Sequence, residues 1–334
     1  MVGETNIESK APAANEFDPN MPRIVVAGVG GAGCNTINRL AKSGVAGAKM
    51  MAFNTDKKHL SLVNEKAVRV LIGARVTKGM GAGGFPEVAE KAARTSYDDI
   101  TKLLEGVDLL FLTAGMGGGT GTGASPVIAE IAKKNGALVV GIVTYPFSLE
   151  RARLKKAEKG IEALRAACDT VVIIDNNRLV EYVPNLPMEQ AFALEDEITA
   201  RAVRGITETI QTPSLINIDF ADMKSVMQNG GVSMIAVGEG KGIDRVEEVA
   251  KNTLEQKLLD VDYTGARGVL LHITGGPEMT LGDANEIGSL ITKDVSGNTN
   301  VIWGARLDPN FAGKVEVIAI FTGMNSPYTL GKKQ

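Results

Sequence analysis

Three glycine-rich segments of this sequence could hold phosphate groups through main-chain amides. The first, Gly28–Gly33, has the spacing G-x-G-x-x-G, and the second, Gly115–Gly123, reads GMGGGTGTG. The third extends from Gly73 to Gly84. Glycine lets backbone N–H groups approach a phosphate closely, and a helix that follows such a turn adds the positive end of its dipole. These segments therefore predict the binding of a phosphorylated ligand.

The arrangement of the three segments favours a polyphosphate over a dinucleotide. Each segment follows an apolar run that we predict to be a strand, and the carboxyl ends of parallel strands form the usual ligand crevice of an open α/β sheet. One such segment suffices for a pyrophosphate, whereas several around one ligand fit a nucleotide polyphosphate better. The P-loop pattern G-x-x-x-x-G-K-[ST] is absent, so the nucleotide would be held in another way. Tight backbone packing is the structural alternative, and it is weakest for GGGTGTG because each glycine costs conformational entropy on folding.

The first segment alone is also the Rossmann fingerprint, which leaves a nicotinamide-dependent oxidoreductase as an alternative. Asp56 stands at the end of the next predicted strand, where an acid that binds the ribose would be sought. Such an enzyme would need a catalytic His, Lys or Tyr constellation in its second half, and the sequence offers no convincing one. The two histidines, His59 and His272, are expected to be structural or solvated.

A pair of carboxylates, Asp219 and Asp222, stands one turn apart at the start of a predicted helix. Acids at a helix N-terminus ordinarily cap the helix and complement its dipole, and this interpretation needs no catalysis. Two carboxylates could also orient a water molecule for in-line attack on a phosphate. The pair follows a long predicted helix, so we expect it to emerge far from the glycine-rich segments of its own chain.

The strands and helices that position these residues are predicted from apolar runs and amphipathic stretches of the sequence. Strands are predicted at 23–30, 49–56, 68–72, 107–115, 137–147 and 170–175, with helices that include 124–134 and 154–167. Apolar strands without polar alternation, separated by helices, indicate a parallel sheet covered on both faces.

The second half of the chain has a different pattern. The strongest helical period covers 188–211, where apolar residues recur every three or four positions. Beyond it, strands are predicted at 233–240, 268–276, 300–308 and 314–323, and helices near 245–258 and 281–294. These elements indicate a smaller, mixed sheet with one face exposed.

The composition is that of a globular protein. The 334 residues are 44% hydrophobic and 22% charged with a formal net charge of −3, and at about 150 residues per domain they predict two domains. The near balance of charge argues against a nucleic-acid-binding protein, and no apolar run approaches the ~18 residues of a membrane span. With 2 cysteines and 2 histidines, a Cys/His zinc site is excluded. Residues 1–22 are predicted to be a disordered arm, and 324–334 a loose tail.

Taken together, these segments resemble the FtsZ family, the prokaryotic relatives of tubulin. GGGTGTG is the signature of tubulin and FtsZ, and VAGVGGAGCN, FNTD, LINIDFADMKSVM and IWGARLD occur in the order found in FtsZ. The resemblance covers about residues 23–324 and favours the archaeal branch. It implies an α/β, tubulin-like fold with a Rossmann-like parallel-sheet GTPase domain at 23–187, a long central helix at 188–211 and a second α/β domain with a mixed sheet, the activation domain, at 212–323.

The resemblance also implies which residues bind the nucleotide. The first segment would contact the diphosphate, the second the β- and γ-phosphates with Thr122 as a hydroxyl donor, and the third would sense the γ-phosphate. Glu150 and Arg153 would contact the ribose and a phosphate, although their stretch is one residue shorter than usual in the family, which leaves Arg151 as an alternative. Phe192 would stack on guanine while Asp196 pairs with its N1/N2 edge. The complete set is Gly31, Ala32, Gly33, Cys34, Asn35, Gly73, Ala74, Arg75, Gly117, Gly118, Gly119, Thr120, Gly121, Thr122, Gly123, Glu150, Arg153, Asn176, Phe192 and Asp196.

The same resemblance implies a role for the two carboxylates. It implies that Asn217, Asp219 and Asp222 complete the active site of the next subunit, so that GTP is hydrolysed to GDP only within a filament. Mg²⁺ is the implied cofactor, and no metal site built from side chains is predicted. A non-hydrolysing structural paralogue remains an alternative, against which the intact triplet argues.

The implied partners are chiefly further copies of the chain in a head-to-tail homopolymer. Division-ring and membrane-tethering proteins are also implied, at the division site in the cytoplasm. Neither nucleic acid nor direct membrane insertion is expected.

Overall fold

The structure is a computed structural model that describes residues 6–7, 21–45, 47–178, 185–211, 214–228, 230–255 and 263–324. The prediction of a disordered arm at 1–22 is wrong for Asn6–Ile7, which form a short strand. Residues 1–5 and 8–20 of that arm, and the predicted tail after residue 324, lie outside the described residues. The chain divides into two compact units, Met1–Ala200 and Arg201–Gln334.

The first unit is built on a sheet in the order β1-β4-β3-β2-β5-β6-β7. All its pairings are parallel except that of the short β1 with β4. Because the parallel strands end at one edge, the glycine-rich segments that follow them meet there. The strands are β1 (Asn6–Ile7), β2 (Ile24–Val29), β3 (Ala48–Asn54), β4 (Val68–Leu71), β5 (Leu109–Gly115), β6 (Leu138–Tyr145) and β7 (Thr170–Asp175).

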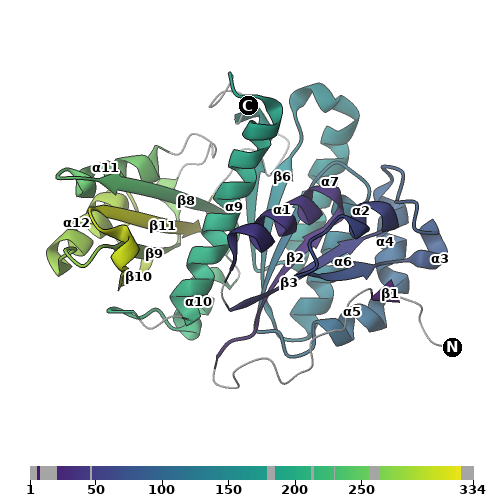
Figure 1. The fold of residues 1–334 in the computed structure, drawn as a ribbon, viewed down its shortest axis with the longest axis horizontal. Helices are drawn as coiled ribbons and strands as arrows, with labels where there is room; N and C mark the ends of the chain where they lie inside the picture. Colours follow the sequence, from purple (N-terminus) through teal and green to yellow (C-terminus); the bar gives the residue numbers. More distant parts are fainter. Residues whose placement is uncertain are drawn as a thin grey trace. The chain divides into compact units, whose positions relative to one another are not determined.

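Helices cover both faces of this sheet, as the apolar strands predict (Figure 1). Alternate residues of β2, Val25 and Ala27 among them, point into a core shared with α4, α6 and α7. Gly28 points the opposite way, since a Cβ there would lie 2.6 Å from the Ile37 side chain of α1. The helices of this unit are α1 (Gly30–Ser43), α2 (Lys57–Ser61), α3 (Ala74–Thr77), α4 (Pro86–Thr95), α5 (Tyr97–Leu103), α6 (Thr120–Lys134) and α7 (Arg151–Ala167).

The long predicted helix is α9 (Met188–Gln211), and the division between the two units falls within it. The second unit contains β8 (Gly231–Lys241), β11 (Lys314–Thr322), β9 (Gly268–Gly275) and β10 (Asn300–Leu307), in that order across its sheet. The β9–β10 pair is parallel and the others are antiparallel, so the sheet is mixed, as predicted.

The expectation of an exposed face is wrong for β9, which is buried along its whole length. On one face of this sheet, α11 (Arg245–Leu254) and α12 (Leu281–Thr292) cover an apolar core. On the other face, Gly205 of α9 packs closely on Ile318, and Glu208 pairs with Arg306 at 3.0 Å. The carboxyl-terminal half of α9 thus belongs to the second unit as a structural element.

None of the helices in the described ranges has both the length and the apolar character that crossing a membrane requires.

Candidate functional site

A cavity of about 1030 Å³ lies at the carboxyl edge of the sheet of the first unit. Turns after β2, β3, β5, β6 and β7 contribute to its lining, as does the start of α9. All three glycine-rich segments reach it. Among the predicted residues, those that line it are Gly31, Ala32, Gly118, Gly119, Thr120, Gly121, Glu150, Arg153, Asn176 and Phe192.

The first glycine-rich segment is the start of a helix rather than the loop that the sequence suggested. Gly30 has a φ of +74°, which turns the chain directly from β2 into α1. Gly28 and Gly33 serve packing, because a Cβ on Gly28 would lie 2.2 Å from the carbonyl oxygen of Gly33. Gly31 instead lines the cavity. The structural and the ligand-binding interpretations therefore both apply, each to different glycines.

Cys34 and Asn35 follow in the first turns of α1. The Cys34 side chain is fully buried, and this burial raises its pKa to about 12. A thiol in that state is neutral and unreactive, so Cys34 contributes its main chain rather than its sulfur to this turn.

The second segment also enters its helix early, because α6 begins at Thr120 and the predicted helix begins at 124. Pro126 therefore lies inside α6, where it lacks the N–H that would donate to the carbonyl oxygen four residues before it. Thr122 is buried, and its Oγ1 accepts the N–H of Gly117 at 2.9 Å. The hydroxyl therefore shapes the loop, while Gly118, whose Cβ would meet nothing within 4 Å, leaves space toward the cavity.

The two ends of the third segment differ in whether they line the cavity. Gly73 has a φ of +61° and precedes α3, of which Ala74 and Arg75 form the first turn. Gly81 and Gly84, with φ values of +83° and +77°, line the cavity. The glycines nearest the cavity are thus the later ones of this segment.

The opposite side of the cavity carries the residues expected at the ribose and the base. Arg153 lines it and pairs with Glu150. Phe192 packs edge-on against Phe147, with ring centroids 5.9 Å apart and planes inclined by 67°. An apolar slot with polar groups beside it can hold a planar base.

Asp196 lies one turn beyond Phe192 on α9, where it contacts α1. Its two carboxylate oxygens accept one hydrogen bond each, from Thr36 Oγ1 at 2.8 Å and from Arg39 Nε at 2.8 Å. Since the Asp196 side chain is only 15% exposed, this pairing fixes the orientation of the carboxylate.

Three polar residues at the end of β3 and just after it, Asn54, Asp56 and His59, line the cavity. From the sequence, no role there was predicted for Asn54 or His59, and Asp56 was considered only as the ribose-binding acid of the oxidoreductase alternative. The Oδ1 atom of Asp56 accepts the main-chain N–H of His59 at 3.0 Å and caps α2. The signal was available, since β3 neighbours β2 in a parallel sheet and a strand that ends in Asn-Thr-Asp delivers polar side chains to the same edge.

The triplet belongs to the second unit: Asn217 and Asp219 precede α10 (Phe220–Met227), and Asp222 lies in the first turn of that helix. Ile216 forms a two-bond bridge to Ala305 of β10, and Ile218 is buried. All three members of the triplet are exposed. The capping interpretation holds for Asp219, whose Oδ1 accepts the Asp222 N–H at 2.7 Å, and the remaining carboxylate oxygens face solvent.

Comparisons with known proteins decide the family. A family model described as the GTPase domain of the Tubulin/FtsZ family matches residues 23–184, and one described as the C-terminal domain of the FtsZ family matches residues 231–325. The chain is 58% identical to cell division protein FtsZ 2 of Methanocaldococcus jannaschii, over 93% of this chain and 82% of that protein. This chain belongs to the FtsZ family.

Further relatives agree with this assignment. Cell division protein FtsZ 2 of Haloferax volcanii is 52% identical over 93% of this chain and 77% of its own. The solved structure of an empty FtsZ dimer from M. jannaschii superposes with a TM-score of 0.85 at 44% identity, covering 90% of this chain and 88% of that one. The tubulin-like α/β fold predicted from the sequence is thereby confirmed.

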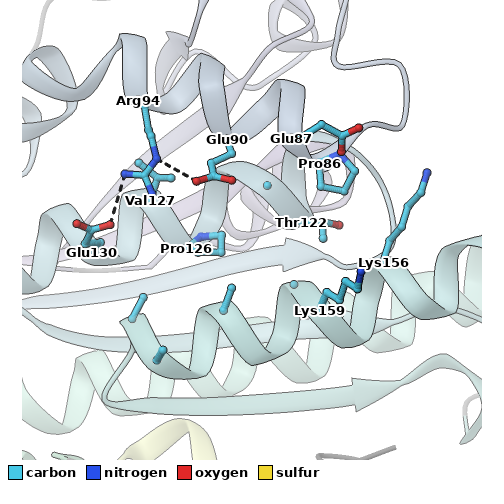
Figure 2. A pocket seen from close by; sticks show the side chains of 15 residues that line it. Pro86, Glu87, Glu90, Arg94, Thr122, Pro126, Val127, Glu130, Lys156 and Lys159 are labelled. Carbon is cyan, nitrogen blue, oxygen red and sulfur yellow. Dashed lines mark hydrogen bonds and ion pairs between the residues drawn. The ribbon is translucent and has the colours of Figure 1, made fainter.

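This FtsZ-family chain has a second cavity in its first unit, a groove of about 640 Å³ between α4, α6 and α7. Figure 2 shows Arg94 of α4 reaching both Glu90 and Glu130, at 2.9 and 3.7 Å. Lys156 of α7 donates to the carbonyl oxygen of Gly84 at 2.7 Å. Because these charges are engaged with protein groups, the larger cavity is the better candidate for a phosphorylated ligand.

No group of three or more His, Cys, Asp or Glu side chains in the described part of the chain is arranged to hold a metal ion. A metal that acts at this site would have to use oxygen atoms of its ligand.

Proposed function

We propose that this chain binds and hydrolyses GTP and polymerises head-to-tail into filaments of a division ring. One observation carries the proposal: three glycine-rich segments reach one cavity in the first unit, while a pair of exposed carboxylates stands on an anchored loop of the second. The likeness to cell division proteins FtsZ 2 supports the cellular role.

The triphosphate occupies the cradle formed by the starts of α1 and α6. Main-chain N–H groups of Gly31–Asn35 hold the α- and β-phosphates, and those of Gly117–Gly123 hold the β- and γ-phosphates. Gly73–Arg75 and the following turn respond to the γ-phosphate. Glu150 and Arg153 bind the ribose and a phosphate, and Asn176 contributes beside them.

Guanine stacks on the ring of Phe192, which packs edge-on against Phe147. The N1–H and N2–H donors of guanine reach the carboxylate of Asp196, which Thr36 and Arg39 hold in place. Adenine offers no such pair of donors to this carboxylate, which is how the site rejects ATP.

Mg²⁺ fits the donor set at the phosphate end of the cavity. Asp56 supplies a carboxylate and Thr120 a hydroxyl, and Mg²⁺ is usually held by one or two carboxylates with substrate phosphates. When bound, the ion neutralises charge that develops on the phosphates.

Hydrolysis is completed by the neighbouring subunit. Asp219 and Asp222, aided by Asn217, orient a water molecule for in-line attack on the γ-phosphate held by the adjacent chain. Donor amides of the cradle stabilise the charge on the γ-phosphate. The contact joins unlike surfaces, and such a contact gives an open filament when its rotation does not close a ring.

The roles divide along the chain as the sequence predicts. Residues 23–187 hold the nucleotide, 188–211 form the connecting helix, and 212–323 present the triplet. The protein acts in the cytoplasm at the division site, where ring and membrane-tethering proteins are its further partners.

Light scattering and sedimentation with GTP, GDP and ATP test the proposal, combined with a phosphate-release assay. GTP alone should produce polymers that pellet, and phosphate release should accompany them. If GTP gives neither polymer nor phosphate, the proposal is wrong; quenching of NADH fluorescence by the protein in the same buffer would then favour the oxidoreductase.

A further inference from the structure

His59 lines the candidate nucleotide cavity beside the first turn of α1. It belongs to α2, and the Asp56 cap fixes the position of its main chain. A Cβ placed on Gly31 would lie 3.9 Å from the Nε2 atom of His59. This ring nitrogen therefore faces the glycine turn at which a phosphate would rest.

Hydrogen bonds behind the ring indicate which nitrogen carries the proton. Asn54 Oδ1 accepts the main-chain N–H of Asp56 at 3.2 Å, which turns the Asn54 amide so that its Nδ2 lies 3.5 Å from Nδ1 of His59. An amide nitrogen can only donate, so Nδ1 is the acceptor. The proton of the neutral ring then resides on Nε2, the nitrogen that faces Gly31.

The charged groups around His59 indicate why a donor on its side chain would help to bind a phosphate. Among the lining residues in the described part of the chain, Arg153 is the permanent cation, and it pairs with Glu150. Asp56 adds a carboxylate, while Cys34, against Asn54, is kept neutral by burial. A ligand with several negative charges thus meets little positive charge among these lining side chains.

We propose that His59 is a phosphate-binding residue that donates its Nε2–H to the phosphate group seated over the first turn of α1. The inference rests on the proposed function, because it takes the ligand to be a guanosine diphosphate or triphosphate. His59 adds one side-chain donor to a cradle built mainly of main-chain amides.

Equilibrium binding of GDP and of guanosine separates this role from a structural one. We expect His59→Ala to weaken GDP binding about tenfold, since a hydrogen bond to a charged group contributes about 1.5 kcal/mol. Guanosine, which has no phosphate, should bind His59→Ala as it binds the unchanged protein. His59→Gln places a neutral donor near the position of Nε2 and should recover most of the affinity for GDP.

Lys58→Gln is the matched control, because Lys58 is exposed on the same helix. It removes a full positive charge outside the cavity lining and should leave GDP binding unchanged. Equal losses for GDP and guanosine in His59→Ala, or no loss for either, would overturn the inference. If the unchanged protein binds neither ligand, it is the proposed function that fails.

The chain contains only 2 histidines, which makes imidazole NMR a direct second measurement. A ¹⁵N-histidine spectrum should contain two rings, of which His59→Gln identifies one. We expect the Nε2 resonance of His59 to shift with GDP and not with guanosine. An Nε2 resonance that is unmoved by saturating GDP would contradict the proposed contact.

Discussion

At the residue scale, Asp219 combines two roles that substitutions can separate. It caps α10 through its side chain, and we propose that it also orients the attacking water. Asparagine is as good a cap as aspartate, so Asp219→Asn should keep the thermal stability while lowering GTP turnover about 100-fold or more. Asp219→Ala should lose the same activity and also about 1 kcal/mol of stability. Phosphate release and thermal unfolding of both variants test this, and an active Asp219→Asn would leave Asp219 as a cap alone.

The Asp196 carboxylate should decide between GTP and ATP. Asp196→Asn replaces one acceptor with a donor, so we expect GTP affinity to fall at least about tenfold and the preference over ATP to shrink. Thr36→Val removes one hydrogen bond to the carboxylate without changing its charge, and its effect should be smaller. Competition of GTP and ATP for each variant measures both effects, and an unchanged preference in Asp196→Asn would contradict base recognition by this side chain.

At the scale of elements, Gly118 and Gly123 of the second glycine-rich segment should respond differently to substitution by alanine. A Cβ on Gly123 would lie 1.9 Å from the Pro86 carbonyl oxygen, so Gly123→Ala should force α4 and α6 apart and cost about 1–3 kcal/mol or more. Gly118→Ala, whose Cβ meets nothing within 4 Å, should keep the stability but weaken nucleotide binding, since it lines the cavity. Thermal unfolding and GDP binding check the pair, and equal destabilisation would show that both glycines serve packing.

The sheet of the second unit should make the protein sensitive to acid. His272 on β9 is buried, neither ring nitrogen has a hydrogen-bond partner among the described residues, and burial, with Arg306 nearby, lowers its pKa to about 4 from 6.5. Folding then favours the neutral ring, so its full contribution to stability is present above pH 6.5 and is lost as pH falls toward 4. The difference approaches about 3 kcal/mol.

Denaturant unfolding at pH 7 and pH 5 measures this dependence. His272→Leu, which cannot take up a proton, should lose less stability between the two pH values than the unchanged protein does. Identical losses in the two proteins would show that other groups govern the acid response.

The strands and helices were predictable from the sequence where a single pattern, an apolar run or a helical period, was strong. Apolar runs identified the strands, and the helical period found α9 almost to its ends. The starts of α1 and α6 were misplaced, because glycine and proline ordinarily mark loops, whereas positive-φ turns at Gly30 and Gly117 bring these helices forward. The place of His59 in the lining was missed because it follows from the parallel pairing of β3 with β2, which brings the turn after β3 to the edge of the sheet where the cavity lies.

At the scale of the whole molecule, the proposed hydrolysis requires carboxylates that a second copy of the chain supplies. The cavity lining comes from residues 31–192, and the triplet stands on an exposed loop of the other unit. In the filament that we propose, a heterologous contact would bring the triplet of one copy to the cradle of the next. Activity should therefore be a property of the polymer and not of the single chain.

Steady-state GTP turnover per molecule, measured across a series of protein concentrations, tests this claim most directly. We predict that turnover is near zero below a threshold concentration and rises steeply above it, together with sedimentable polymer. Asp222→Ala should show the same polymer threshold and little turnover at any concentration. Turnover per molecule that stays constant and high down to concentrations at which only monomer is present would contradict catalysis shared between subunits.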